Sequence, residues 1–278
     1  MSIRVDHICK SFQDRGNRKK RKLVLQDVCF EVPEGKFVSL VGPSGCGKST
    51  TLTIIAGFQE RDSGEVIVNG NIVTKPGPDR AFVFQDYALL PWLKVGENIT
   101  YPLKQRGVPR SEREQRLSEL LSLAQLEESR NSYIYELSGG MKQRVALLRA
   151  LACDPQVLLM DEPLGAVDFQ MRKLLQIQLE SILMQKRVTT LMVTHDVDEA
   201  VYLSDRVIVM GRDHGNIIAD VEIDLPRPRD RASEAYHHYS DILTAKLGEA
   251  LSGEIFTKED EDIMNFIKNA EIESRRHC

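Results

Sequence analysis

The chain has 278 residues, of which 42% are hydrophobic and 28% are charged, and its formal net charge is −4. This length suits one large domain or two small ones, and the globular composition excludes disordered and collagen-like chains. The charge balance excludes a global basic field for nucleic acid, and no apolar run approaches the roughly 20 residues that span a bilayer. We also expect no secretory signal, and five cysteines without a CxxC pair predict reduced thiols rather than disulfides or a zinc knuckle.

Apolar residues in alternating or continuous runs predict four strands near the start of the chain. These strands cover residues 3–12, 23–32, 36–41 and 64–70. The charged stretch 14–22 is predicted to be a solvated hairpin loop, with a phosphate-binding or nuclear-targeting patch as the alternative. The third strand stops at a glycine-rich turn, and the residues after this turn have helical spacing.

The second half of the chain alternates helical and strand signals. From about residue 86 to 154 helical signals dominate, including an amphipathic pattern over 111–126. Later apolar runs predict three strands buried on both faces, with an amphipathic helix between the first two. The strands cover residues 157–160, 189–194 and 206–210, and the helix covers 169–187. Buried strands alternating with helices predict a parallel α/β sheet with an inserted helical subdomain.

The glycine-rich turn, residues 42–49, fits G-x-x-x-x-G-K-[ST]. Glycines let backbone N–H groups turn toward an anion, and the helix that follows points its N-terminus at the same place. Lys48 is predicted to reach the β- and γ-phosphates of a nucleotide, and the Ser49 hydroxyl to bind Mg²⁺. The predicted nucleotide-binding residues of this loop are Gly42, Ser44, Gly45, Cys46, Gly47, Lys48, Ser49 and Thr50. The place of Cys46 beside Lys48 predicts a lowered thiol pKa and inactivation by alkylation.

Two further motifs carry chemistry. The buried run 157–160 ends in two carboxylates, of which Asp161 is predicted to hold Mg²⁺, with a helix cap as the alternative. Glu162 is predicted to polarise the attacking water as general base. A second glycine turn, Ser138–Gly140, opens a helix and is a second anion-binding device. One chain seldom needs two such devices for one nucleotide, so we expect two chains to sandwich it.

In combination these motifs resemble the ATP-binding cassette family, the motor subunits of ABC transporters, over roughly residues 1–225. Leu137–Met141 matches the signature turn of the family, with Met141 in place of the usual glutamine. The resemblance implies that Ser138, Gly139 and Gly140 contact the nucleotide of the opposite chain. It further implies an α/β fold of the P-loop NTPase type with an antiparallel β edge. The helical subdomain falls at about 86–155, and 226–278 forms a short, partly helical appendage.

The resemblance also assigns roles that spacing alone does not. Gln85 matches the residue that contacts Mg²⁺ and water and links the core to the membrane partner, and His195 matches the switch histidine. Asp168 ends a nucleotide-contacting loop in which Gly165 replaces the usual serine. Phe12 matches the aromatic residue that stacks on adenine, with a core position as the alternative. The implied catalytic residues are Glu162, His195, Gln85 and Lys48.

A finer resemblance is to importers of nitrate, sulfonate and taurine, with nitrate-type subunits the most similar. It rests on residues 76–99, 136–146, 193–210 and 225–229. It implies a second cassette as homodimer or paralogue, a transmembrane permease, indirectly a solute-binding protein, and no nucleic acid. The location implied is peripheral, on the cytoplasmic face of the inner membrane. Trp92 lies where the permease docks in such importers, and docking requires an exposed side chain. The alternative is that Trp92 is a buried core residue.

Three other functions stay open at this point. The first is a non-transport ABC ATPase acting on ribosomes or DNA, and such proteins carry a second cassette or a long coiled coil that this sequence lacks. The second is a regulatory subunit without turnover, against which the intact Glu162 and His195 speak. The third is transport of another solute, or export. For the tail, a helix packed on its own core and a regulatory contact between cassettes are both open.

Overall fold

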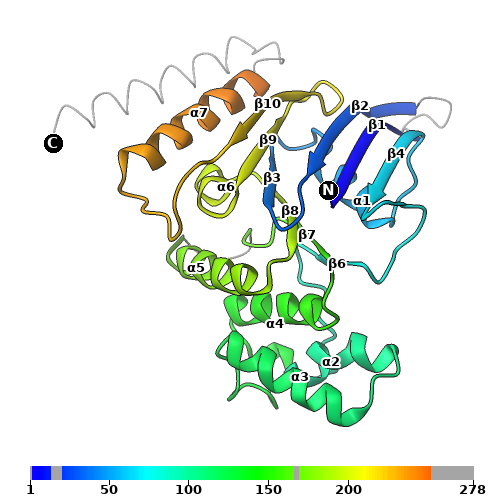
Figure 1. The fold of residues 1–278 in the computed structure, drawn as a ribbon, viewed down its shortest axis with the longest axis vertical. Coiled ribbons are helices and arrows are strands. Elements are labelled where there is room, and N and C mark those ends of the chain that lie inside the picture. Colours follow the sequence, from blue (N-terminus) through cyan, green and yellow to red (C-terminus); the bar gives the residue numbers. More distant parts are fainter. Residues whose placement is uncertain (1, 14–20, 166–168, 252–278) are drawn as a thin grey trace.

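The computed structural model describes residues 2–13, 21–165 and 169–251, and it contains two sheets (Figure 1). The first is antiparallel, in the order β2-β1-β4-β5, and the second has six strands in the order β10-β9-β3-β8-β7-β6. The first sheet contains β1 (Ile3–Gln13), β2 (Arg21–Val32), β4 (Ser63–Val68) and β5 (Asn71–Ile72). The second contains β3 (Phe37–Val41), β6 (Arg80–Val83), β7 (Val157–Asp161), β8 (Thr189–Thr194), β9 (Arg206–Met210) and β10 (Ile217–Glu222).

The helices cover the faces of these sheets. Helix α1 contacts strands of both sheets, and α2, α3 and α4 form a group at the lower end of Figure 1. The bounds of this group are α2 (Val95–Gln105), α3 (Arg110–Leu123), a 3₁₀ turn (Ile134–Glu136) and α4 (Gly139–Leu151). The others are α1 (Lys48–Ala56), α5 (Phe169–Lys186), α6 (Val197–Leu203) and α7 (Glu234–Leu251). None of the described helices combines the length and the apolar character that crossing a membrane requires.

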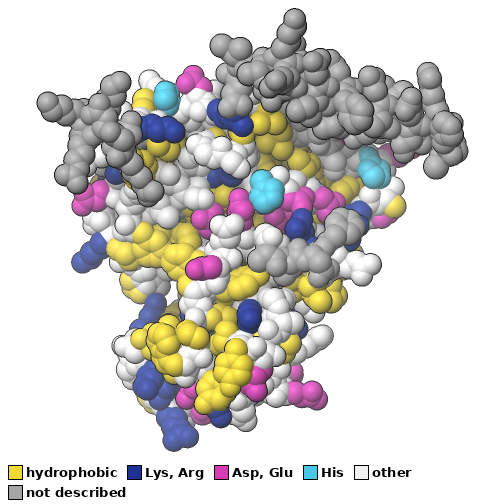
Figure 2. All heavy atoms as spheres, turned by 180° about the vertical axis from the view of Figure 1, so that it is seen from behind, with side chains coloured by type: hydrophobic (Ala, Val, Ile, Leu, Met, Phe, Trp, Pro, Cys, Tyr) yellow, Lys and Arg dark blue, Asp and Glu magenta, His cyan; other side chains and the backbone are white. Residues whose placement is uncertain are grey.

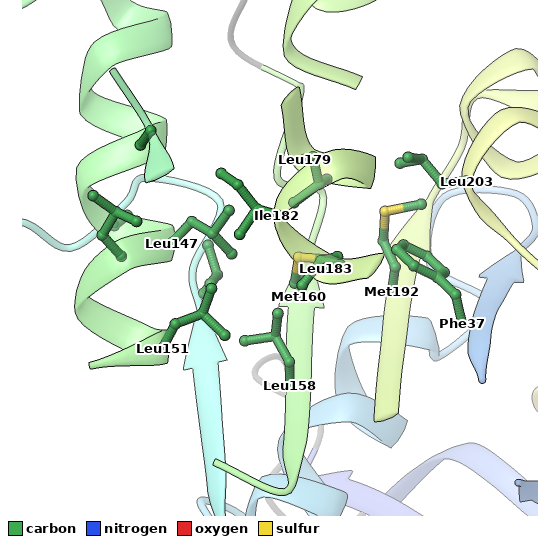
Figure 3. Packing of buried hydrophobic residues seen from close by; sticks show 14 of the residues in the cluster. Phe37, Leu147, Leu151, Leu158, Met160, Leu179, Ile182, Leu183, Met192 and Leu203 are labelled. Carbon is green, nitrogen blue, oxygen red and sulfur yellow. The ribbon is translucent and has the colours of Figure 1, made fainter. Parts of the chain in front are cut away.

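The central strands are buried on both faces. They separate two hydrophobic cores, and each strand contributes side chains to both. In β7, Leu158 and Met160 belong to the core under α4 and α5, whereas Val157 and Leu159 belong to the core under the antiparallel sheet. Figure 3 shows Leu158 and Met160 facing the leucines of α4 and the side chains of α5. This division follows from the two-residue period of a strand, which sends successive side chains to opposite faces. A slip of one residue would exchange the two cores, so the register is fixed.

Residues 226–251 pack on α5 and α6 and on strands β9 and β10 of the second sheet. On α7, Tyr236 and Leu243 are buried, and the Tyr236 hydroxyl donates a hydrogen bond to Asp198 Oδ1 at 2.6 Å. Arg227 pairs with Glu180 at 2.5 Å, and the buried Arg229 donates to the carbonyl of Val201. Desolvation lowers the pKa of Arg229 to about 10. The division of the chain at 225 stays a prediction, and the rest of the predicted appendage lies outside the described residues.

The predicted fold class, a mixed sheet with an antiparallel edge and a helical insert, is confirmed. The seven strands expected from the sequence are all present, but β10 and the short strands β5 and β6 were not among those predicted. Strand β6 has four residues, too few for a periodic pattern, and β10 is a half-exposed edge strand without a continuous apolar run. Helices α2, α6 and α7 were also not assigned individually.

The packing of α7 gives a stability test. Leu243 has no exposed surface, and removing its side chain would leave a cavity against the second sheet. Leu243→Ala is therefore expected to lower the free energy of unfolding by about 2–5 kcal/mol in urea titration. Leu251→Ala, on the same helix at 39% exposure, is the control and should change it by less than about 0.5 kcal/mol. Equal effects of the two variants would show that α7 is not part of the core.

Candidate functional site

The predicted site residues gather at one edge of the six-stranded sheet. Strands β3, β8, β7 and β6 are neighbours and run parallel, so their carboxyl ends lie side by side. The register aligns these ends, because Val41 pairs with Thr194, Asp161 with Val193, and Val83 with Met160. The four strands are followed by the predicted phosphate-binding loop (residues 42–49, the phosphate loop), His195, Glu162 and Gln85. Such an edge is where open α/β sheets bind ligands.

The phosphate loop has the backbone shape of an anion cradle. Gly47 has φ of 107°, and a Cβ there would lie 2.5 Å from Leu25 Cδ2, so only glycine fits. No side chain caps the N-terminus of α1, which leaves its first N–H groups to an anion. The buried Lys48 ammonium lies inside the loop and donates to the carbonyls of Gly42 at 2.7 Å and Pro43 at 2.9 Å. The loop therefore presents N–H groups and a cation to one point.

The structure contradicts the lowered thiol pKa predicted for Cys46, whereas its contact with nucleotide and inactivation by alkylation stay predictions. Its side chain is only 1% exposed, and burial raises the pKa of the thiol, outweighing the opposing effect of Lys48. The neutral thiol is favoured because a thiolate would lose its hydration in this position. Cys46 is thus a small buried residue of the loop, and we expect slow alkylation.

Ser49 and Asp161 make the pair expected to hold a metal ion. The Ser49 hydroxyl donates to Asp161 Oδ1 at 2.9 Å, so one hydroxyl and one carboxylate oxygen meet beside the phosphate loop. Burial raises the pKa of Asp161, an effect that Ser49 and Lys48 oppose and Glu162 reinforces. A carboxylate that is costly to ionise in its own surroundings gains most from a nearby cation. Oxygen ligands of this kind fit Mg²⁺.

Glu162 connects the two remaining predicted catalytic side chains. Its Oε1 lies 3.2 Å from His195 Nδ1, and its Oε2 accepts a hydrogen bond from Gln85 Nε2 at 3.3 Å. Glu162 has φ of 43°, in the left-handed region that is strained for a glutamate, and its N–H donates to Val193 O at 2.9 Å. Two side chains, each following a neighbouring strand, thus contact the carboxylate of Glu162.

A buried carboxyl group lies behind His195 and was not predicted. Glu199, on α6, is 3% exposed and hydrogen-bonds to the Thr194 hydroxyl, which also accepts from Asp196 N–H. Asp196 caps α6 by accepting from Glu199 N–H at 3.2 Å, and it pairs with Arg172 at 2.8 Å. His195 therefore sits between two residues whose side chains are held by α5 and α6. A glutamate among the apolar residues of a short helix is the sequence signal for such a group.

The signature turn forms a helix start as expected. The Ser138 hydroxyl caps α4 by accepting from Met141 N–H at 3.3 Å, and Gly139 and Gly140 form its first turn. Gly140 packs on α5, where an added Cβ would meet Leu175 at 3.3 Å. Across the described ranges, no hydrogen bond or ion pair joins this turn to the phosphate loop of the same chain. The two anion-binding devices are therefore separate within one chain.

Phe12 and Asp168 are the two remaining residues predicted to contact the nucleotide. The Phe12 ring is 36% exposed and lies under Lys10 Nζ at 5.3 Å, so Phe12 is not a core residue. Its stacking on adenine stays a prediction. Asp168 lies outside the described residues, and the predicted contact with nucleotide stays a prediction as well.

Exposed apolar side chains gather over the helical group α2–α4 (Figure 2). Trp92 is 70% exposed, which excludes the core alternative. Its loop is held by the buried Asn98, which accepts from Leu90 N–H at 2.9 Å and donates to the carbonyls of Leu90 and Leu93 at 3.1 Å each. Asn98 was not predicted, although an asparagine on the apolar side of a helix is a recognisable signal. Asn98 thus fixes the loop without requiring Trp92 to pack inward, and the indole stays exposed.

Comparisons with known proteins agree with this geometry. A family described as ABC transporter matches residues 25–165. The aliphatic sulfonates import ATP-binding protein SsuB of Bacillus cereus is 42% identical over 85% of this chain and 92% of its own length. The nitrate import ATP-binding protein NrtC of Synechococcus elongatus is 45% identical over 85% of this chain, which spans 36% of that longer protein. A dimeric structure of the ATP-binding cassette MJ0796 bound to ADP and Pi has 30% identity and a TM-score of 0.68, over 80% of this chain and 98% of that one.

The buried Glu199 predicts a pH-dependent stability. Burial raises its pKa from the ordinary 4.5 to about 8, so the folded protein keeps a proton that the unfolded chain releases. This stabilisation is full below about pH 4.5 and is lost as the pH rises to about 8. Between pH 6 and pH 9 the wild-type Tm is expected to fall about 5 °C more than that of Glu199→Gln. The exposed Glu128→Gln should follow the wild type, and parallel curves for all three would contradict the assignment.

Proposed function

The chain belongs to the ABC transporter ATP-binding family, and on that basis we propose that it powers the import of a small anionic solute of the nitrate, sulfonate or taurine type. The family resemblance expected from the motifs is confirmed, and the chain is an ATPase subunit of an ABC transporter. The observation that carries the proposed mechanism is the contact of Glu162 with both His195 and Gln85.

Each residue at the edge has a distinct proposed task. Lys48 and the N–H groups at the start of α1 bind the β- and γ-phosphates. Glu162 accepts a proton from the attacking water, while His195 and Gln85 hold its carboxylate in place. Ser49, Asp161 and Gln85 are the residues that would hold Mg²⁺, which when bound neutralises charge on the phosphates. Phe12 stacks on the base.

Two copies complete the site. Cassettes of this family dimerise, as the MJ0796 structure shows for that protein. Since no hydrogen bond or ion pair in the described part of the chain joins the signature turn to the phosphate loop, we propose that Ser138, Gly139 and Gly140 bind the γ-phosphate held by a second cassette. The paired state then depends on ATP and is lost after hydrolysis, because only the triphosphate is shared by both chains.

The permease and the solute are the finer part of the proposal. Trp92 is proposed to dock on a transmembrane permease, which places the chain at the cytoplasmic face of the inner membrane, with a solute-binding protein acting through the permease. The solute class rests on relatives named for nitrate and for aliphatic sulfonates, both of which are anions. Uptake of labelled nitrate, taurine and an uncharged control by vesicles containing the permease and this chain tests it.

The first prediction from this mechanism concerns turnover. Glu162→Gln keeps the shape of the side chain but removes the base, so ATP hydrolysis should fall by about 10²–10⁴-fold while ATP binding persists. ATP should then trap a dimer, visible by light scattering after gel filtration. The exposed Glu65→Gln is the control and should hydrolyse ATP normally. A Glu162→Gln protein that hydrolyses ATP at the wild-type rate would remove Glu162 from its role.

The second prediction concerns the partner. Trp92→Ala should leave the ATPase rate of the isolated chain unchanged and weaken binding to the permease by about 30-fold, as for a hot spot of about 2 kcal/mol. Co-purification from detergent-solubilised membranes measures this. Ile72→Ala, 52% exposed in the antiparallel sheet, should bind normally. Retention of RNA instead of a multi-span membrane protein would favour a non-transport ATPase.

A further inference from the structure

The hairpin of β1 and β2 carries an irregularity that involves none of the residues at the carboxyl ends of β3, β8, β7 and β6. His7 has φ of 51° and Asp27 has φ of 56°, both in the left-handed region that favours glycine. The pairing of the strands shifts register on both sides of Ile8. Bulges of this kind re-aim side chains and are found at functional sites. The question is which side chains this bulge brings together.

The bulge places three metal-binding side chains on one face of the hairpin. In a regular strand Asp6 and His7 would point to opposite faces, yet here Asp6 Oδ1 lies 3.7 Å from His7 Nε2. Ligand atoms of Asp6, His7 and Cys29 all lie within 4.8 Å of one another. Donors around one tetrahedral zinc ion lie about 3.3–3.8 Å apart, as its bond lengths of about 2.0–2.3 Å require. Asp6 Oδ1 and His7 Nε2 already lie at this spacing, and the Cys29 thiol lies within 4.8 Å of a ligand atom of each.

A second observation points to the same ligand. His7 Nδ1 lies 2.5 Å from Asp27 Oδ1, and since a carboxylate only accepts, the ring donates there. Histidines that bind metals through one nitrogen characteristically donate the other N–H to a carboxylate, which fixes the tautomer and the ring orientation. The free lone pair of neutral His7 is then on Nε2, which faces Asp6. Asp6 is prepared in the same way, because its Oδ2 accepts from Arg4 at 2.9 Å and Oδ1 is left toward His7.

We propose that Asp6, His7 and Cys29 bind a zinc ion, with Asp27 as the residue that positions His7. A donor set of one thiolate, one imidazole and one carboxylate binds zinc in preference to magnesium or calcium. Water would take the fourth position on the ion. The site joins β1 to β2 and shares no residue with the proposed Mg²⁺ ligands. It lies on the strand that carries Phe12, so a bound ion would stiffen the hairpin next to the proposed base contact.

Protons compete with the ion, which sets the conditions of the test. The hydrogen bond to Asp27 raises the pKa of His7, an effect that Asp6 reinforces and Arg4 opposes. The measurement is therefore made at pH 8, where more His7 is neutral. Co²⁺ is the probe, because thiolate coordination gives it a charge-transfer absorption that oxygen and nitrogen ligands alone do not give.

The full chain without nucleotide is titrated with Co²⁺, followed by Zn²⁺. The wild type should bind one equivalent with a thiolate band that Zn²⁺ abolishes, and Zn²⁺ should raise its Tm. Cys29→Ser should lose the band, and Asp27→Asn should keep the band at saturation but bind about 10–100-fold more weakly.

The matched controls are Cys9→Ser in the same hairpin and Cys278→Ser at the end of the chain, and both should keep the band and the affinity. Cys9 is the stricter control, because its thiol lies 3.4 Å from the N–H of Asp27 without belonging to the three-residue cluster. Absence of the band in the wild type, its persistence in Cys29→Ser, or its loss in Cys9→Ser would each overturn the assignment.

Discussion

The alignment of four parallel strand ends is the constraint on which the rest of the structure depends. Hydrogen bonding between β3, β8, β7 and β6 fixes where each chain segment leaves the sheet, and each exit carries one part of the site. The two cores hold this register, since the strands send alternate side chains into each of them. Glu162 can occupy a strained backbone conformation because the sheet on one side and His195 and Gln85 on the other determine its place.

Local signals predicted most of this edge, because a continuous apolar run followed by a charged or glycine-rich turn is a strong pattern. The parts that could not be predicted depend on contacts between distant segments. Glu199 becomes a buried acid only when α6 packs behind β8, and the burial of Cys46 outweighs the neighbouring lysine that the sequence shows. Strand β10 needs β9 beside it to be a strand at all.

The cluster of Asp6, His7 and Cys29 on the β1–β2 hairpin also depends on contacts between distant segments, which the sequence could not predict. Cys29 lies 22 residues from His7 along the chain, and no spacing rule for metal sites covers a pair brought together by a bulge. Sequence spacing therefore excluded a zinc knuckle but carried no information on a site built across two strands. The signature turn is the opposite case, because its sequence is plain while its nucleotide partner lies on another chain in the proposed dimer.

Helix α4 joins two regions that would otherwise be independent. Ser138 caps its first turn. Near its other end, Arg149 donates hydrogen bonds to the carbonyls of Tyr87 and Ala88 at 2.9 and 2.8 Å, in the segment between Gln85 and Trp92. Thirteen helical residues form a rod about 20 Å long. A helix of this length links the signature turn to the base of the Trp92 loop, so in the proposed dimer a shift at Ser138 would be carried to Tyr87 and Ala88.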